Sequence, residues 1–579
     1  MLKFVANSAT LYKIVVDQAV ASASEMHAAS ELASFIGQVT GAIIPVVTNP
    51  AAVMKGYGKT NKVIALGKSV LTEALGVDEA IDAVGDEGFI LRTVGETIVI
   101  AGGRLRGTLY GVYTFLEDYL GCRWYTPTVS NIPKRFNINL PEINVTKTPA
   151  FRIREAFNME NFDGNWAARN KSNAHHHQLL PEHGGALRYV GVHSFNRLLP
   201  PDEYFDEHPE YFSEINGVRV KERSQLCLTN PDVFEIVLKN LRQTILDHPE
   251  CSVFSVSQND WGNYCTCEKC RAIDEEEESP MGTVLRFVNK IDDAIRKEFP
   301  HISIDTLAYQ YTRKLPKITK PNPGVLIRLC TIECCFAHPL DECHVDKYAM
   351  PSNFSEDIAA WSKVSNDLFI WDYTTDFAHY LMPFANLNVL KRNLKFFKDH
   401  GAIGVFEEGC PNTYLSYAGE LRNYVLSKLM YDMDLDDKLL IDEFICGVYG
   451  SAAAHVKAFY QLWQDVCAAS GEHLFEDDMP TRSYFTRENL DKARALLDQA
   501  MVVASDEMTR LRIEKIALSC DYMDVAQMDK GTEKDAAVDA LIQKCKDMGM
   551  ARSTEWHTFE QTAEIAKSID AFVPGTCTR

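Results

Sequence analysis

The chain has 579 residues, with 59 Lys and Arg against 80 Asp and Glu, which gives a formal net charge of −21. This acidic balance, with no clustered run of basic residues, argues against a protein that binds the nucleic-acid backbone. With 46% hydrophobic and 24% charged residues, the composition excludes wholesale disorder and fibrous structure. No stretch reaches the roughly 20 uninterrupted apolar residues that a membrane span needs.

The N-terminal residues 1–16 lack the continuous apolar segment and the small-residue cleavage site of a secretory leader. The sequence therefore leaves two locations open. The protein is either cytoplasmic, or exported to the periplasm or cell surface with its leader absent from this chain. The oligomeric state is not readable from the sequence.

Residues 1–145 predict a small α/β domain. Short apolar runs such as KVIALG, GFILRTV and TIVIAGG are bounded by glycine or charge, as strands are. Helical spacing of apolar residues covers 26–41 and 109–120, and each stretch ends at a glycine. Prolines at 127, 133, 141 and 149 then indicate a linker.

Residues 150–430 predict a (β/α)₈ barrel of the TIM type, because eight short apolar strands alternate with helical stretches. The expected strands are Phe151–Phe157, Val190–Ser194, Gln225–Leu228, Val253–Ser257, Ile302–Ala308, Val325–Leu329, Leu368–Trp371 and Ile403–Phe406. A doubly wound open sheet is the alternative, but no glycine-rich phosphate loop follows the first strand. Residues 431–579 predict a helical C-terminal domain, since apolar residues recur there every three or four positions.

Carboxylates follow four of the predicted strands, at the end where barrel enzymes carry their reactive groups. They are Asp260, Glu333, Asp372 and Glu408. Glycosidic cleavage needs one protonated carboxyl for the leaving oxygen and one ionised carboxylate for water or direct attack. The working hypothesis makes Asp260 the general acid, with Glu333 as its alternate. Asp372 or Glu408 is then the base or nucleophile.

Aromatic and polar residues beside these carboxylates suit a carbohydrate, whose CH faces pack on aromatic rings. The expected substrate-binding residues are Trp261, Tyr309, Trp371 and Tyr373 as a sugar platform, with His193, Asn259 and Glu407 as polar contacts. The rival hypothesis is a non-catalytic glycan-binding protein on a glycosidase-like barrel. A carboxyl pair about 5–10 Å apart favours hydrolysis, and aromatic residues without such a pair favour binding.

Two groups stand out among the sixteen cysteines. Three cysteines in a C-x-C-x-x-C run, with a fourth from the preceding strand, can hold a structural zinc ion; they are Cys265, Cys267, Cys270 and Cys227. Disulfides or free thiols are the alternatives, and each arrangement would brace the loop that carries Asp260. All-thiolate zinc sites are normally closed, so no cofactor is expected for catalysis. The second group, Cys330, Cys334, Cys335 and Cys343, matches no zinc spacing and indicates a loop-bracing disulfide or buried thiols.

Several stretches resemble known families. The text from Gly103 to Trp124, GRLRGTLYGVYTFLEDYLGCRW, resembles the N-terminal domain that precedes the barrel in α-glucuronidases of glycoside hydrolase family 67. Similar domains precede the barrel of family 20 hexosaminidases. Four other stretches resemble a bacterial domain of unknown function, DUF4838; they are GVHSF, HPEYF, QLCLTNP and the Ser257–Asp260 segment. The resemblance covers about residues 1–430.

The resemblance implies a bacterial, exported glycosidase that degrades polysaccharides. Family 20 enzymes carry an Asp-Glu pair after the fourth strand, whereas this chain has Asn259-Asp260, which argues against substrate-assisted hexosaminidase chemistry. Family 67 enzymes use a glutamate after the fourth strand as acid and a later Asp and Glu as base. By position, Asp260 takes the acid's place, and Asp372 and Glu408 match the later residues.

Overall fold

The computed structural model describes residues 1–55 and 62–576, and these form two compact units. Each unit is assembled from three separate stretches of the chain. Unit 1 contains Met1–Ala186, Ala418–Phe459 and Ala495–Ile516, and unit 2 contains Leu187–Tyr417, Tyr460–Arg494 and the residues from Ala517 onward. Neighbouring residues within a unit can therefore be hundreds of positions apart in the sequence.

Unit 1 contains a six-stranded sheet in the order β10-β5-β6-β4-β2-β3. Its strands are β2 (Lys13–Val16), β3 (Val46–Val47), β4 (Val63–Leu66), β5 (Phe89–Val94), β6 (Thr97–Gly102) and β10 (Asn144–Lys147). β2, β3, β4 and β6 are parallel, whereas β5 and β10 run antiparallel to their neighbours. The unit also holds β1 (Leu2–Val5), β7 (Arg123–Thr126), β8 (Val129–Asn131), β9 (Ile138–Leu140) and β11 (Ile153–Phe157).

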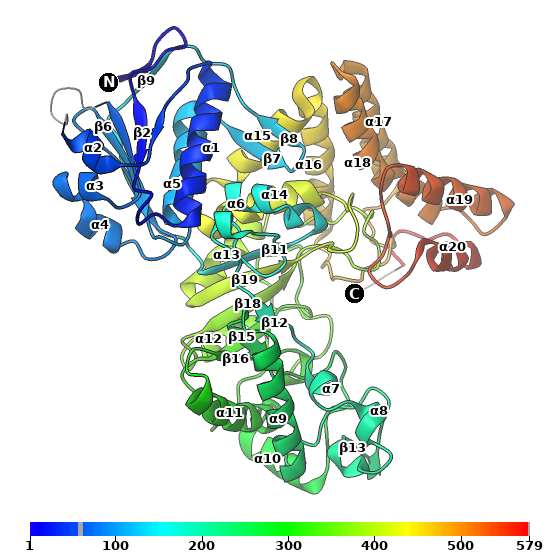
Figure 1. Cartoon of the computed structure of the whole chain (residues 1–579). Coiled ribbons are helices and arrows are strands. Elements are labelled where there is room, and N and C mark those ends of the chain that lie inside the picture. Colours follow the sequence, from blue (N-terminus) through cyan, green and yellow to red (C-terminus); the bar gives the residue numbers. More distant parts are fainter. Residues whose placement is uncertain (56–61, 577–579) are drawn as a thin grey trace. The chain divides into compact units, whose positions relative to one another are not determined.

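Alternating apolar residues give this sheet two buried faces, as a strand with a period of two requires. Ile64 and Leu66 belong to one core cluster together with residues of α1 (Ala23–Thr40) and α5 (Gly107–Phe115), while Val63 and Ala65 belong to another. The second cluster includes residues of α3 (Val70–Ala74) and α4 (Asp78–Asp82). Figure 1 shows these two helix pairs on opposite sides of the strands.

Unit 1 also contains several other helices. They are α2 (Pro50–Met54), a π-helix (Leu116–Leu120), α6 (Gly164–Arg169), α14 (Gly419–Tyr431) and α15 (Asp437–Tyr449).

Unit 2 contains six parallel strands in the order β19-β18-β17-β16-β15-β12. They are β12 (Tyr189–Val190), β15 (Val253–Ser255), β16 (Ser303–Ala308), β17 (Val325–Cys330), β18 (Leu368–Tyr373) and β19 (Ala402–Glu408). The helices of eight or more residues between them are α9 (Pro231–Asp247), α10 (Glu268–Glu277), α11 (Met281–Glu298), α12 (Phe354–Trp361) and α13 (Leu390–Asp399). Figure 1 shows α9, α10 and α11 side by side. Because all six strands are parallel, their carboxyl ends meet at one edge.

Seven of the eight strands predicted for the barrel are strands in the structure, namely β11, β12 and β15–β19. The exception is Gln225–Leu228, which makes only an isolated bridge between Leu226 and Phe212. The Gln225 side chain instead makes hydrogen bonds to the backbone of the loop after β15. In unit 2 the strand order does not return on itself, so the described strands form an open parallel sheet rather than a closed eight-stranded barrel.

Most of residues 431–576 are helical, but they are divided between unit 1 and unit 2 rather than grouped in one compact unit. Beyond α15 they form α16 (Ala453–Ser470), α17 (Arg487–Val503), α18 (Glu507–Ala526), α19 (Thr532–Asp547) and α20 (Phe559–Ser568). One stretch, Asp437–Ser470, is long and apolar enough to cross a membrane by length and composition alone. It is divided into α15 and α16 by a turn at Gly450. This is weak evidence for a span, since core helices of soluble proteins meet the same criterion.

Candidate functional site

Asp260 lies on a loop after β15. Hydrogen bonds hold the residues immediately before and after it. The Gln225 Nε2 donates to the carbonyls of Asn259 (3.0 Å) and Trp261 (2.6 Å), and Gln225 Oε1 accepts from the Asn259 backbone N (2.9 Å). The Asp260 side chain remains exposed, and its Oδ1 accepts a hydrogen bond of 2.9 Å from the Tyr309 hydroxyl. The loop thus presents one fixed carboxylate to solvent.

Asn259 and Trp261 support this loop with their side chains. Asn259 Nδ2 donates to Asn196 Oδ1 and to the Ser224 carbonyl, both at 2.9 Å. The indole Nε1 of Trp261 donates to the same carbonyl at 2.9 Å. The polar groups of both residues are therefore engaged in positioning Asp260.

Glu408 ends β19, and the aromatic residues of β18 surround it. Trp371 is in register with Phe406, and Tyr373 with Glu408, so these four side chains share one face of the parallel sheet. Trp371 Nε1 donates to Glu408 Oε2 at 2.7 Å, and the Trp371 ring lies 4.6 Å from Phe406 and 6.3 Å from Tyr373. Two of the predicted platform residues, Trp371 and Tyr373, therefore lie beside a carboxyl group.

Three carboxyl groups of unit 2 act on one another electrostatically; we call Asp260, Glu408 and Glu555 the carboxyl triad. Burial raises the pKa of Glu408 to about 8, and the negative charges of Glu555 and Asp260 add to this shift, against the hydrogen bond from Trp371. Burial also raises the pKa of Glu555, and the charge of Asp260 adds to it. Burial, aided by the two negative charges, therefore favours the protonated form of Glu408 at neutral pH.

Glu555 was not among the residues predicted from the sequence. It lies in the segment between α19 and α20, where its backbone N donates to the Phe377 carbonyl at 2.9 Å. The only local signal is a glutamate beside a tryptophan, Trp556, in a short non-helical segment. Nothing in that pattern relates it to a strand end 147 residues earlier.

Asp372 and Glu407 lie on the opposite face of the sheet from Trp371 and Glu408. They are in register with each other, and both are buried. Burial raises the pKa of Asp372 to about 6 against a hydrogen bond of 2.5 Å from the Thr331 hydroxyl. Burial and the charge of Asp372 raise the pKa of Glu407 well above its usual value. The structure therefore separates Asp372 and Glu407 from the face that carries Glu408.

Asp372→Asn is expected to reduce the dependence of stability on pH between about 4 and 6. A carboxyl whose pKa is raised by folding binds its proton more tightly in the native state, so its contribution is present at low pH and is lost as the pH rises to the folded pKa of about 6. A shift of this size corresponds to about 3 kcal/mol. Urea unfolding at pH 4 and pH 7 measures the effect, with the exposed Asp399→Asn as control. A variant with the wild-type pH dependence would contradict the burial argument.

Glu333 is fully buried after β17. Its Oε2 accepts a hydrogen bond of 3.1 Å from Arg313 Nη1, and the same guanidinium binds Asp346 and Asp357. Burial raises the pKa of Glu333 although Arg313 opposes the shift. Its Oε1 has no hydrogen-bond partner among the described residues. Glu333 thus belongs to a buried ionic network centred on Arg313.

His193 and Tyr309 lie next to each other, with ring centroids 6.1 Å apart. His193 follows β12 in a left-handed backbone conformation (φ 54°), and its Nδ1 lies 2.9 Å from the Gln258 carbonyl. Because a carbonyl oxygen can only accept, Nδ1 is the donor in this contact. His193 is therefore positioned close to the tyrosine that holds Asp260.

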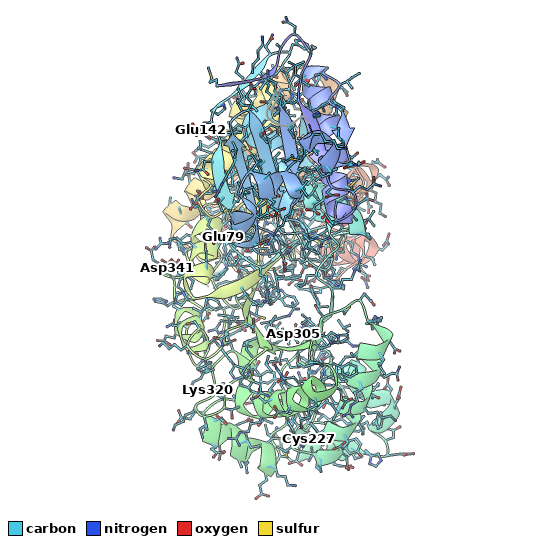
Figure 2. All side chains as sticks on the ribbon, turned by 60° about the vertical axis from the view of Figure 1, so that its left-hand side comes forward. Glu79, Glu142, Cys227, Asp305, Lys320 and Asp341 are labelled. Carbon is cyan, nitrogen blue, oxygen red and sulfur yellow. The ribbon has the colours of Figure 1, made fainter. Side chains whose placement is uncertain are left out.

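The four predicted zinc ligands form one cluster, which we call the four-cysteine cluster (Cys227, Cys265, Cys267 and Cys270). All four are buried, and their sulfur atoms lie within 4.8 Å of one another. The Cys227 sulfur is 3.8 Å from Cys267 and 3.9 Å from Cys270. A tetrahedral zinc ion with Zn–S bonds of about 2.3 Å requires sulfur atoms about 3.8 Å apart. The residues therefore fit a zinc ion. Figure 2 labels one of them, Cys227, on the green part of the chain that also contains Asp305 of β16.

Comparison with solved structures identifies proteins of similar fold. One, described as "A novel family GH115 4-O-Methyl-alpha-glucuronidase, BtGH115A, with specificity for decorated arabinogalactans", aligns over 100% of this chain and 81% of its own, with a TM-score of 0.58 and 12% identity. A second, "Structure of CpGH84B", aligns over 98% and 97% with a TM-score of 0.43 and 12% identity. The first shares the fold; the second is too dissimilar to support an argument.

Two family models match the sequence. The model described as "Glycosyl hydrolase family 67 N-terminus" matches residues 5–115, as the resemblance of the N-terminal residues predicted. No curated protein matches the chain. The model described as "Domain of unknown function (DUF4838)" matches residues 124–461, which is more than half of the sequence. The chain therefore belongs to the DUF4838 family.

Proposed function

We propose that this protein is a glycoside hydrolase that uses Glu408 as general acid and Asp260 as base or nucleophile. The observation that carries the proposal is the Glu408 carboxyl, which accepts a hydrogen bond from Trp371 beside the Tyr373 ring and whose pKa burial and nearby negative charges, Asp260 among them, raise to about 8. Glycosidic cleavage needs such a pair, one carboxyl to donate a proton and one to attack or to activate water.

These roles reverse the order expected from the sequence, which placed the acid at Asp260. The reversal follows from the environment of each group. Glu408 is surrounded by aromatic rings and faces two negative charges, and both factors favour its protonated form. Asp260 is exposed and accepts a hydrogen bond from Tyr309, a partner that suits a carboxylate. In the proposed reaction Glu408 protonates the leaving oxygen, and Asp260 attacks the sugar carbon or removes a proton from water.

The comparisons support a carbohydrate substrate. The N-terminal residues match a domain of family 67 glycosyl hydrolases, and the fold is shared with an α-glucuronidase of family GH115. We propose a poly- or oligosaccharide as substrate and a scaffold related to the (β/α)₈ barrel, because the parallel strands present their carboxyl ends at one edge. A screen of aryl glycosides and glycans, including ones that carry uronic acids, tests this function. Binding of a glycan without turnover would favour the glycan-binding alternative instead.

The alkaline limb of the pH profile is expected to report Glu408. Activity on a glycan should fall as the pH rises through about 8, because the acid loses the proton that it must donate. Glu555→Gln removes a negative charge beside Glu408, so the limb should move to lower pH while activity in its acidic range is largely kept. Glu564→Gln, an exposed residue of α20, is the matched control. An unchanged limb in Glu555→Gln would argue against Glu408 as the acid.

We also propose that the four-cysteine cluster binds a structural zinc ion that braces the loop carrying Asp260. Cys270→Ser is expected to lower the zinc content by one ion per chain, because it removes one of four ligands. Cys251→Ser, which changes a buried cysteine outside the cluster, should keep the wild-type content. Elemental analysis of both variants gives the answer, and equal zinc in both would refute the site.

A further inference from the structure

Two cysteines and two histidines form a second group of potential metal ligands in unit 2, which we call the Cys₂His₂ cluster (Cys335, His338, Cys343 and His473). Three of them follow β17, and His473 follows α16. One ligand atom from each residue lies within 4.8 Å of the others. The Cys335 sulfur is 3.3 Å from His338 Nδ1, and the Cys343 sulfur is 3.5 Å from His473 Nδ1.

We infer that the Cys₂His₂ cluster binds a zinc ion. Zinc with Zn–S bonds of about 2.3 Å and Zn–N bonds of about 2.0–2.1 Å places a sulfur and a nitrogen ligand about 3.5 Å apart in a tetrahedron. The two measured sulfur–nitrogen distances, 3.3 and 3.5 Å, are close to this value. Two thiols and two imidazoles are soft and borderline ligands that suit zinc and do not suit magnesium or calcium.

Of the two alternatives that the sequence offered for these cysteines, a disulfide or buried thiols, the arrangement is not the disulfide. Cys335 and Cys343 are both free thiols in the structure, and each sulfur lies next to an imidazole nitrogen. A pair of separate thiol–imidazole hydrogen bonds would not require all four atoms to lie within one small sphere. Four protein ligands also complete a tetrahedron, so the site is closed and its zinc is structural rather than catalytic.

A zinc ion here would join two segments that already touch. The Phe336 backbone N donates to the Leu474 carbonyl at 2.9 Å, and Lys347 Nζ lies 2.8 Å from Glu476 Oε1. The Phe336 ring in turn lies 6.3 Å from the ring of Tyr373. The metal would therefore hold the loop whose Phe336 packs against Tyr373, one of the aromatic residues beside Glu408. The four ligands would then act as positioning residues for Tyr373.

The sequence shows only half of this site. Cys335-x-x-His338 is a compact pair with a spacing seen in metal sites, and Cys343 follows five residues later. The fourth ligand, His473, is 130 residues from Cys343. Only the fold brings the two parts together, so the spacing of the cysteines alone matches no zinc motif.

Zinc analysis of purified full-length variants tests the inference. His473→Ala is expected to contain one zinc ion per chain fewer than the wild type, and His473→Cys, which restores a ligand, should keep the wild-type content. His301→Ala, an exposed histidine of the same unit, is the control for a general effect of losing a histidine. Combining His473→Ala with Cys270→Ser distinguishes this site from the four-cysteine cluster, because the two losses should add.

A His473→Ala chain that folds and retains the full zinc content would overturn the inference. A Cys335–Cys343 disulfide peptide found by mass spectrometry of the unreduced protein would also overturn it. Alkylation of the wild-type protein gives a test that needs no variant. Cys343 is partly exposed, yet it should resist alkylation until a chelator removes the metal, and equal alkylation before and after chelation would count against a bound ion.

Discussion

Glu408→Gln is expected to lower kcat on a natural glycan by about 10²–10⁴-fold, the usual contribution of a general acid. The amide has nearly the same shape, and its Oε1 can still accept the hydrogen bond from Trp371. It cannot donate a proton to the leaving oxygen with the ease of a carboxylic acid. The loss should therefore fall on the chemical step, and substrate binding should change little.

Substrates with different leaving groups separate the acid from other roles. An aryl glycoside that releases a weakly basic phenol needs little protonation, so Glu408→Gln should hydrolyse it at close to the wild-type rate. Asp260→Asn should lose activity on both kinds of substrate, because attack is needed in each case. Glu407→Gln, one residue away on the opposite face, is the matched control. Equal losses of Glu408→Gln on both substrates would assign Glu408 to the nucleophile instead.

Arg313→Ala is expected to destabilise the protein by about 3–5 kcal/mol, the typical cost of breaking a buried ion pair from one side. Arg313 is fully buried, and its guanidinium binds Glu333, Asp346 and Asp357 at 2.7–3.1 Å. Removing it leaves three carboxyl groups without their cation. Arg313→Lys should be intermediate, since an ammonium group cannot reproduce the planar fork.

The destabilisation of Arg313→Ala should grow with pH. Burial already raises the pKa of Glu333 and Asp357 against the opposing effect of Arg313, and without the guanidinium both pKa values should rise further. Groups with raised pKa values favour the native state when protonated, so stability is lost as they ionise on going to neutral pH. Urea unfolding at pH 5 and pH 7 measures this. Arg392→Ala, which breaks an exposed ion pair, should change stability very little, and a similarly small effect of Arg313→Ala would contradict the network.

Periodicity predicted most of the strands because each buried strand of a parallel sheet is a short apolar run. It failed at Gln225–Leu228, which has a short apolar run like those of the strands. There the Gln225 side chain hydrogen-bonds to the loop that carries Asp260, and Cys227 belongs to the four-cysteine cluster. These uses depend on residues more than thirty positions away. The pattern of hydrophobicity contains no information about them.

Only part of the candidate site could be predicted from the sequence, because contacts between distant residues decide the rest. The end of β19 offers Glu407 and Glu408 in succession, and only the register with β18 shows which one shares a face with Trp371. Alternation along a strand distinguishes them, but an error of one residue in the predicted strand reverses the assignment. Glu555 could not be predicted, because its relation to Asp260 and Glu408 arises from packing between distant parts of the chain.

The position of Glu555 has a consequence for how such an enzyme could change during evolution. Asp260 and Glu408 are carried by the parallel sheet and its loops, whereas Glu555 is carried by a connection between two C-terminal helices. In the proposed mechanism a negative charge there raises the pKa of Glu408, while Asp260 and Glu408 carry out the reaction. Relatives with a neutral residue or a shorter connection at this point would work in more acidic surroundings. The optimum pH can thus be inherited separately from the chemistry.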